Sequence, residues 1–150
     1  MFQKILAPVD LSEPDIASAA FEIAGEMARA SGGSVRLLHV INGAVTIAPM
    51  LYLPPVDFNQ LGETQKKALA ELTKGIDLPA DRITTNVRIG GVYPEVLAEA
   101  LEWNADLVIV GAHRPSMATY LLGSSSTAIV RHATCSVLVV RSSKAASFFA

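Results

Sequence analysis

The segment LVIVGAHRPSMATYLLGSSSTAIVRHATCSVLVVR, residues 107–141, holds the pattern that decides the fold. Its two apolar runs, Leu107–Val110 and Val137–Val140, have the length and composition of buried strands. Between them lie a polar turn, an apolar loop, and Gly123 followed by four hydroxyl residues that open the predicted helix Ser124–His132. A strand, a helix and a second strand in this order predict one parallel β-α-β unit.

The rest of the chain repeats this alternation of strands and helices. Apolar runs without alternating polar residues predict strands buried on both faces, and apolar residues at helical spacing predict the helices between them. The predicted strands are Lys4–Val9, Ser34–Val40 and Ile83–Ile89. The first predicted helix follows the N-cap candidate Ser12, has Pro14 in its first turn and ends at Ser31-Gly32-Gly33. The next two are marked from Phe58 to Leu72 and from Pro94 to Asn104. The residues of the third helix that we expect to face the sheet are Val96, Leu97, Ala100 and Leu101.

Five strands alternating with four helices indicate an α/β fold of the Rossmann-like type. We expect a parallel doubly wound sheet in the order 3-2-1-4-5, with helices on both faces and right-handed crossovers. In that order the winding reverses between the first and fourth strands, and ligands bind outside the carboxyl ends of the strands at the reversal. Those ends are Pro8-Val9-Asp10 and Val110-Gly111-Ala112-His113. No domain boundary is evident, so we expect one domain over residues 1–150.

Composition excludes several classes of function. The formal net charge is −2, so there is no electrostatic reason to expect nucleic acid or an anionic membrane as a partner. No apolar run reaches the roughly 20 residues that span a bilayer, and the first residues do not have the pattern of a signal peptide. The single cysteine, Cys135, excludes an intramolecular disulfide and fits a cytoplasmic setting.

The sequence carries no recognised catalytic or metal-binding motif. It contains neither G-x-x-x-x-G-K-[ST] nor the G-x-S-x-G nucleophile elbow. Its three histidines and one cysteine do not have metal-ligand spacing. We therefore assign no catalytic residue and no protein metal site, and we expect that the protein is not an enzyme.

Gly123-Ser124-Ser125 is the main candidate for binding an anion. The first N–H groups of a helix lack partners and carry the positive end of the helix dipole, and glycine lets the backbone approach a ligand closely. The same residues also suit an ordinary serine N-cap after a glycine turn. Asp10 leaves a similar choice, because a carboxylate there can accept from a ribose hydroxyl, help hold Mg²⁺, or cap the next helix.

The turn after the fourth predicted strand contains two basic candidates. His113 and Arg114 could both face phosphates, whereas His113 could equally bond to the backbone of the turn. The apolar loop 116–122 either covers a ligand or packs on the sheet. His39 lies inside a predicted strand and is interpreted as a core or edge residue.

Four stretches together resemble the universal stress protein family: KILAPVDLSE from residue 4, LLHV ending at Val40, ADLVIVGAHRP from residue 105 and LLGSSSTAIVRHATCSVLVVR ending at Arg141. The resemblance covers nearly the whole chain, and the closing run is its most specific part. The HRP turn and the YLLGS loop are similar to those of the F/G-type branch of small single-domain bacterial members. The resemblance implies an adenine-nucleotide alpha-hydrolase-like form of the Rossmann-like fold.

The resemblance also implies ATP binding, with the adenine against the ends of the first two strands and the phosphates in a glycine-rich loop. By position, Gly111 matches the first glycine of the family motif, and Gly123 with Ser124 matches the third. Pro8 and Asp10 match residues near the adenine and ribose. The complete predicted cofactor-binding set is Pro8, Val9, Asp10, Val40, Val110, Gly111, His113, Arg114, Gly123, Ser124 and Ser125, with Val40 matching the residue whose backbone faces the adenine.

The chain departs from the family motif at two places. The position of the second glycine holds Arg114, and the loop from there to Gly123 is one residue shorter. An arginine could pair with a phosphate directly, or it could fill the site. We favour pairing.

The resemblance implies a homodimer in which Val137–Val140 pairs with its counterpart across a two-fold axis, and pairing would protect an apolar edge strand. We therefore predict a cytoplasmic, homodimeric stress-response protein that binds ATP together with Mg²⁺. Two alternatives stay open. One is a dimeric partner-binding module whose nucleotide site is closed by Arg114, and the other is a slow ATPase or self-phosphorylating protein with Ser124 or Ser125 as the acceptor.

Overall fold

The computed structural model describes residues 1–11, 14–42, 58–111 and 124–141. Every predicted strand and helix is confirmed, and most bounds move by one or two residues. The elements are β1 (Lys4–Pro8), α1 (Pro14–Ser31), β2 (Ser34–Asn42), α3 (Phe58–Thr73), the 3₁₀ helix η1 (Ala80–Arg82), β3 (Ile83–Gly90), α4 (Val92–Trp103), β4 (Leu107–Gly111), α5 (Ser124–His132) and β5 (Ser136–Val140).

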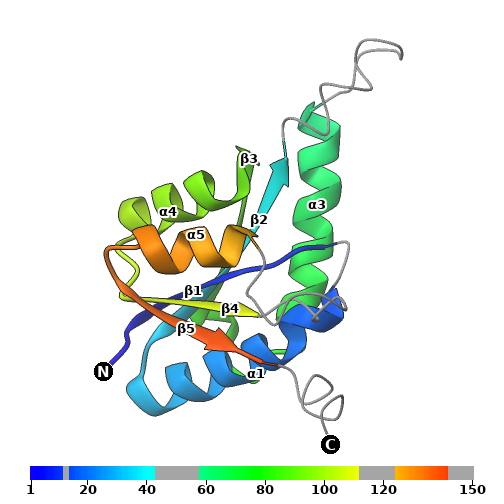
Figure 1. Ribbon diagram of the computed structural model, residues 1–150. Helices are drawn as coiled ribbons and strands as arrows, with labels where there is room; N and C mark the ends of the chain where they lie inside the picture. Colours follow the sequence, from blue (N-terminus) through cyan, green and yellow to red (C-terminus); the bar gives the residue numbers. More distant parts are fainter. Residues whose placement is uncertain (12–13, 43–57, 112–123, 142–150) are drawn as a thin grey trace, which may run out of the picture.

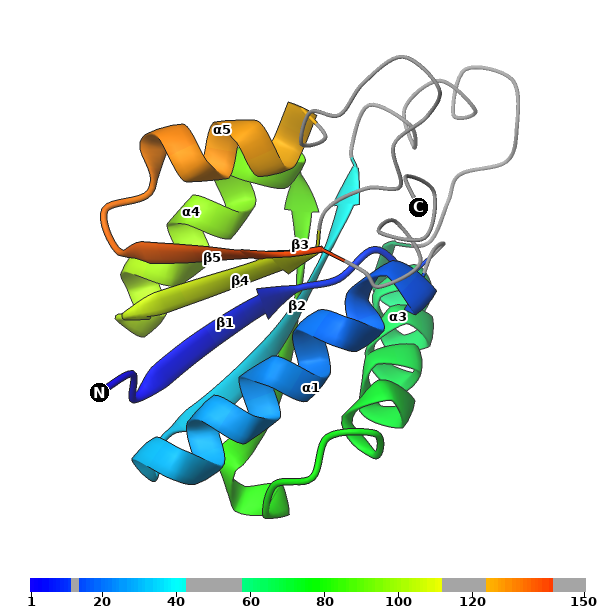
Figure 2. The ribbon, with the colours of Figure 1, turned by 60° about the horizontal axis from the view of Figure 1, so that its bottom comes forward.

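The five strands form one parallel sheet in the order β3-β2-β1-β4-β5, which confirms the predicted topology (Figure 1). Helices α1 and α3 cover one face of the sheet, and α4 and α5 cover the other (Figure 2). The winding reverses between β1 and β4, as expected for this order. The fold thus places the carboxyl ends of β2, β1 and β4 next to one another.

The two faces of the sheet bury separate apolar clusters. Ile5 and Leu37 pack with Leu69 of α3, whereas their neighbours Leu6 and Leu38 pack in the cluster that includes α4 and α5. Successive residues of a strand point to opposite faces, so a strand covered on both sides buries apolar residues at successive positions. This arrangement explains the continuous apolar runs of β1, from Ile5 to Ala7, and of β4, from Leu107 to Val110.

The prediction of which α4 residues face the sheet was wrong at Leu101. Glu99 is only 2% exposed, whereas Leu101, which we expected to face the sheet, is 63% exposed. The helix begins at Val92, two residues earlier than predicted, and ends at Trp103; Asn104 caps it in the left-handed conformation with φ 59°. Pro94 is tolerated in the first turn because the N–H groups there have no partner within the helix.

Gly33 joins α1 to β2 where the backbone passes close to the start of the chain. A Cβ atom at this position would lie 2.7 Å from the carbonyl oxygen of Gln3 and 2.9 Å from that of Phe2. The neighbouring Ser34 N–H donates to the same Gln3 carbonyl at 2.8 Å, so the two segments are held together. Only glycine fits this approach without a shift of the backbone.

We expect Gly33→Ala to lower the free energy of unfolding by about 2 kcal/mol, within the cost of overpacking a well-packed region. The control is Gly62→Ala in α3, where a Cβ would meet nothing within 4 Å. That change should be neutral or slightly stabilising, because alanine favours a helix over glycine. Urea unfolding of the three proteins measures both effects, and equal stability of the two variants would contradict the prediction.

Candidate functional site

The predicted site residues of the first, second and fourth strands lie together at the carboxyl edge of the sheet. Pro8 ends β1 and is paired with Leu38 of β2. Val40 lies two residues further along β2, and Val110 and Gly111 close β4. This edge combines apolar and polar residues. Val9, Val40 and Val110 are buried, whereas Asp10 is exposed to solvent.

Helix α5 starts at this same edge, since it returns antiparallel to the strands that it connects (Figure 2). Its first turn contains Ser124 and Ser125 and no acidic residue. Ile129 of α5 is buried in the same cluster as Val40 and Val110. The helix therefore packs on the face to which these two valine side chains point, with its positive end at the carboxyl edge.

Several predicted site positions lie outside the described residues. They are His113, Arg114, Gly123 and the apolar loop 116–122. Their roles stay predictions, including the pairing of Arg114 with a phosphate.

One contact at this edge involves a residue that sequence reasoning did not assign to the site. The Nδ1 atom of His39 lies 3.1 Å from the carbonyl oxygen of Val9, 30 positions away in the chain. A carbonyl oxygen can only accept, so Nδ1 carries the proton and donates. The Val9 N–H in turn donates to the Leu38 carbonyl at 2.8 Å. No sequence motif signals such a contact, because it depends on how β1 and β2 pair.

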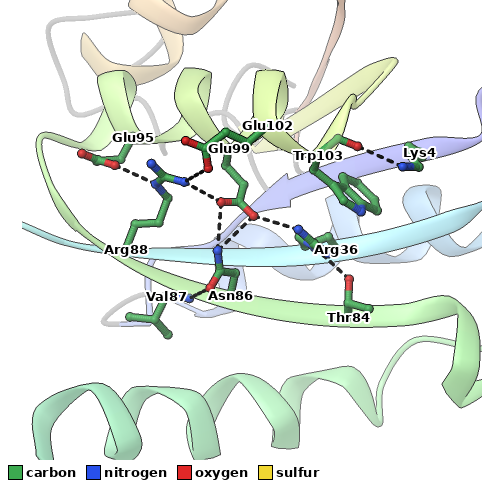
Figure 3. Close-up of polar contacts among 10 residues, drawn as sticks. All are labelled: Lys4, Arg36, Thr84, Asn86, Val87, Arg88, Glu95, Glu99, Glu102 and Trp103. Atoms are coloured by element: carbon green, nitrogen blue, oxygen red, sulfur yellow. Dashed lines mark hydrogen bonds and ion pairs between the residues drawn. The ribbon is translucent and has the colours of Figure 1, made fainter. Parts of the chain in front are cut away.

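A second polar cluster lies on the α4 side of the sheet and surrounds the Glu99 carboxylate (Figure 3). One oxygen accepts from Arg36 Nη1 at 2.9 Å, and the other accepts from Arg88 Nη1 at 2.9 Å. The Asn86 amide donates to both oxygens, at 3.0 and 2.9 Å. Arg88 also pairs with Glu95 at 2.7 Å and with the more exposed Glu102 at 2.8 Å. The cluster ties α4 to β2 and β3.

The electrostatics of this cluster favour the ionised form of the Glu99 carboxyl. Burial alone would raise the pKa of the Glu99 carboxyl, but hydrogen bonds from Arg88, Asn86 and Arg36 outweigh burial and lower this pKa below its ordinary value. The Arg88 pKa is raised by its bonds to Glu102, Glu95 and Glu99. Within the described part of the chain, no buried side-chain nitrogen or oxygen lacks a partner. We therefore interpret the cluster as a structural network.

The described residues show neither a metal centre nor a membrane-spanning helix. These residues contain no group of three or more His, Cys, Asp and Glu side chains placed to hold a metal ion. None of the helices formed by them is long and apolar enough to cross a membrane.

Comparison with known proteins agrees with the sequence resemblance. The model of the universal stress protein family matches residues 1–141. Universal stress protein G of Shigella flexneri is 34% identical over 143 residues, which cover 94% of this chain and 100% of that protein. This chain belongs to the universal stress protein family. The predicted family membership is thus confirmed.

Solved structures of universal stress proteins share the fold. UspA from Lactobacillus plantarum matches with a TM-score of 0.67 and 24% identity, over 93% of this chain and 98% of that one. A universal stress protein in complex with cAMP matches with a TM-score of 0.64 and 22% identity, over 93% and 97% of the two chains. These likenesses establish the Rossmann-like α/β fold of the family for this chain.

Proposed function

We propose that this universal stress protein binds ATP at the carboxyl edge of β1, β2 and β4, and acts in the stress response through nucleotide occupancy. The observation that carries the proposal is the meeting, at one edge, of the Val40 backbone, the exposed Asp10 and the positive end of α5. An adenine nucleotide needs an apolar place with backbone hydrogen bonds for its base, and donors or positive charge for its phosphates. The edge offers both kinds of group.

The backbone of Val40 fits the base. The Leu38 carbonyl and the Ser34 N–H both bond to the β1 side, so the even-numbered residues of β2 direct their backbone groups toward β1. Val40 shares this direction, and β1 ends as a strand at Pro8, opposite Leu38. The N–H and carbonyl of Val40 thus face the place where β1 leaves the sheet. One donor beside one acceptor matches the hydrogen-bonding edge of adenine.

The first turn of α5 fits the phosphates. Its first N–H groups and the Ser125 hydroxyl would supply donors where the helix dipole is positive, and the predicted role of Ser124 is part of this proposal. We propose that Gly111, Gly123, His113 and Arg114 complete the phosphate site, as the family motif predicts. Mg²⁺ is commonly bound by one or two carboxylates together with substrate phosphates, and Asp10 offers a carboxylate at this edge. Mg²⁺ would neutralise phosphate charge there.

A structurally similar universal stress protein has been solved in complex with cAMP, which contains adenine. This complex supports the proposal that the ligand of this chain is an adenine nucleotide. We assign no catalytic residue, and a binding role in the cytoplasm remains our proposal. Differential affinity for two states of the protein would let ATP act as a signal.

We propose in addition that the chain forms a homodimer through β5. This strand lies at one end of the sheet order, so among the described strands it has a neighbour, β4, on one side only. Val137, Leu138 and Val139 are each half-buried within this chain. Pairing with a second copy would satisfy the edge, which is otherwise prone to unspecific pairing. Sedimentation equilibrium measures the mass, and a monomer at micromolar concentration would refute the dimer.

The test of nucleotide binding uses the purified full chain. Chromatography of the denatured protein identifies any adenine nucleotide carried through purification, and calorimetry with ATP and Mg²⁺ measures affinity. We expect saturable binding at one site per chain. The absence of binding at millimolar ATP would overturn the proposal and favour the partner-binding module closed by Arg114. Release of phosphate over hours would instead show a slow ATPase.

A further inference from the structure

His39 is placed to shape the edge where the proposed nucleotide site lies. It belongs to β2, directly before Val40, and its half-buried side chain points to the face covered by α1 and α3, as that of Leu37 does. Its Nδ1–H donates to the Val9 carbonyl at 3.1 Å. The ring therefore connects β2 to the first residue of the chain beyond β1.

The bond from His39 lies where the hydrogen-bond ladder between β1 and β2 ends. In a parallel ladder, the N–H and the carbonyl of one residue bond to the two residues that flank its partner on the next strand. Val9 obeys this rule on one side, where its N–H donates to the Leu38 carbonyl at 2.8 Å. If the ladder continued, the Val9 carbonyl would accept from the N–H of Val40. That carbonyl instead accepts a hydrogen bond from the imidazole of His39.

We propose that His39 is a positioning residue of the nucleotide site, which takes over the donor role at the Val9 carbonyl so that the Val40 N–H is available to the base. The inference rests on the proposed binding of an adenine nucleotide. The bond ends the β1–β2 ladder one residue early and holds the departing chain in place. Asp10 follows Val9 directly, so the same bond also helps to fix the backbone position from which the Asp10 side chain extends.

Two substitutions distinguish this role from simple filling of space. His39→Phe keeps a ring of similar size but has no donor. His39→Asn is smaller, yet its side-chain amide nitrogen occupies the place of Nδ1 and can donate. If the donor matters, Asn is the milder change; if only packing matters, Phe is the milder change. The order of the two variants therefore decides the question.

The experiment titrates wild type and both variants with ATP and Mg²⁺ by calorimetry, after thermal unfolding has shown that each protein is folded. We expect His39→Phe to weaken binding about tenfold, roughly the net contribution of one hydrogen bond, because the Val40 N–H would then bond to the Val9 carbonyl instead of the base. We expect His39→Asn to stay within about threefold of wild type. Equal binding by His39→Phe and wild type, or weaker binding by Asn than by Phe, would overturn the role of His39.

A second measurement needs no nucleotide. The ¹⁵N chemical shifts of the imidazole report which nitrogen carries the proton, and we expect Nδ1–H in the free wild-type protein. A neutral ring protonated at Nε2 alone would overturn the inference whether or not ATP binds. Wild type that binds no ATP would overturn the proposed function, and the nucleotide part of this inference with it. Failure of His39 alone would leave ATP binding intact, so the two failures are distinguishable.

Discussion

Glu99→Ala should lower the free energy of unfolding by about 3 kcal/mol, the lower end of the cost of breaking a buried ion pair. Glu99 is 2% exposed and accepts hydrogen bonds from Arg36, Arg88 and Asn86. Removing the carboxylate leaves two guanidinium groups and an amide without their common partner. We choose the lower end because the two arginine side chains, at 23% and 21% exposed, keep some contact with water.

The matched control is Glu102→Ala on the same helix. Glu102 also pairs with Arg88, at 2.8 Å, but its side chain is 68% exposed. An ion pair of this kind contributes about 0–1 kcal/mol. Both changes put alanine into α4, so helix propensity cancels between them. Urea unfolding measures the difference, and a Glu99 variant no less stable than the Glu102 variant would show that the network does not hold α4.

The same network predicts a dependence of stability on pH. The pKa of Glu99 is lowered in the folded protein, where hydrogen bonds from Arg88, Asn86 and Arg36 outweigh burial. Its contribution to stability is therefore complete above the pKa of the unfolded chain, about 4.3, and is lost as the pH falls through the folded-state pKa. We expect the stability gap between wild type and Glu99→Gln to be widest near neutral pH and to narrow below about pH 4. A gap independent of pH would contradict the prediction.

Gly123→Val should abolish nucleotide binding, with a loss of affinity of at least about a hundredfold, equivalent to roughly 3 kcal/mol. Gly123 directly precedes α5 and is proposed to let phosphates reach the first N–H groups of that helix. A β-branched side chain there would occupy the space of the phosphates and restrict the backbone. Calorimetry with ATP and Mg²⁺ measures the loss.

The control for this substitution is Gly75→Val. Gly75 follows α3 at the amino edge of the sheet, opposite the proposed site, and a Cβ there meets only the Leu72 carbonyl oxygen, at 3.5 Å. The control should bind ATP like wild type. Unchanged affinity in the Gly123 variant would place the phosphates elsewhere on the protein. Similar thermal unfolding of the two variants would show that the loss is local.

Much of the fold follows from the chain alone. Strands such as Ile5–Ala7 are apolar at every position, which requires cover on both faces and so a parallel sheet between two helix layers. The alternation of strands and helices, with right-handed crossovers, then restricts the strand order strongly. The same topology put Asp10, Val110 and Gly111 at one edge before any contact was known. The motif around Gly123 and Ser124 depended on resemblance, because a glycine and a serine before a helix also form an ordinary N-cap.

The sequence by itself therefore determined the family, the strand order and the edge at which a ligand is proposed to bind, since these depend on local pattern and general rules of chain connection. Tertiary structure alone decided that Glu99 is buried while Leu101 is exposed. Periodicity ranks leucine above glutamate for a buried face, but the partners of Glu99 come from β2 and β3, and 63 positions separate it from Arg36. The bond from His39 to Val9 has the same origin. Glu99 and His39 bond to residues that are distant in the chain and that only the folded sheet brings within hydrogen-bonding distance.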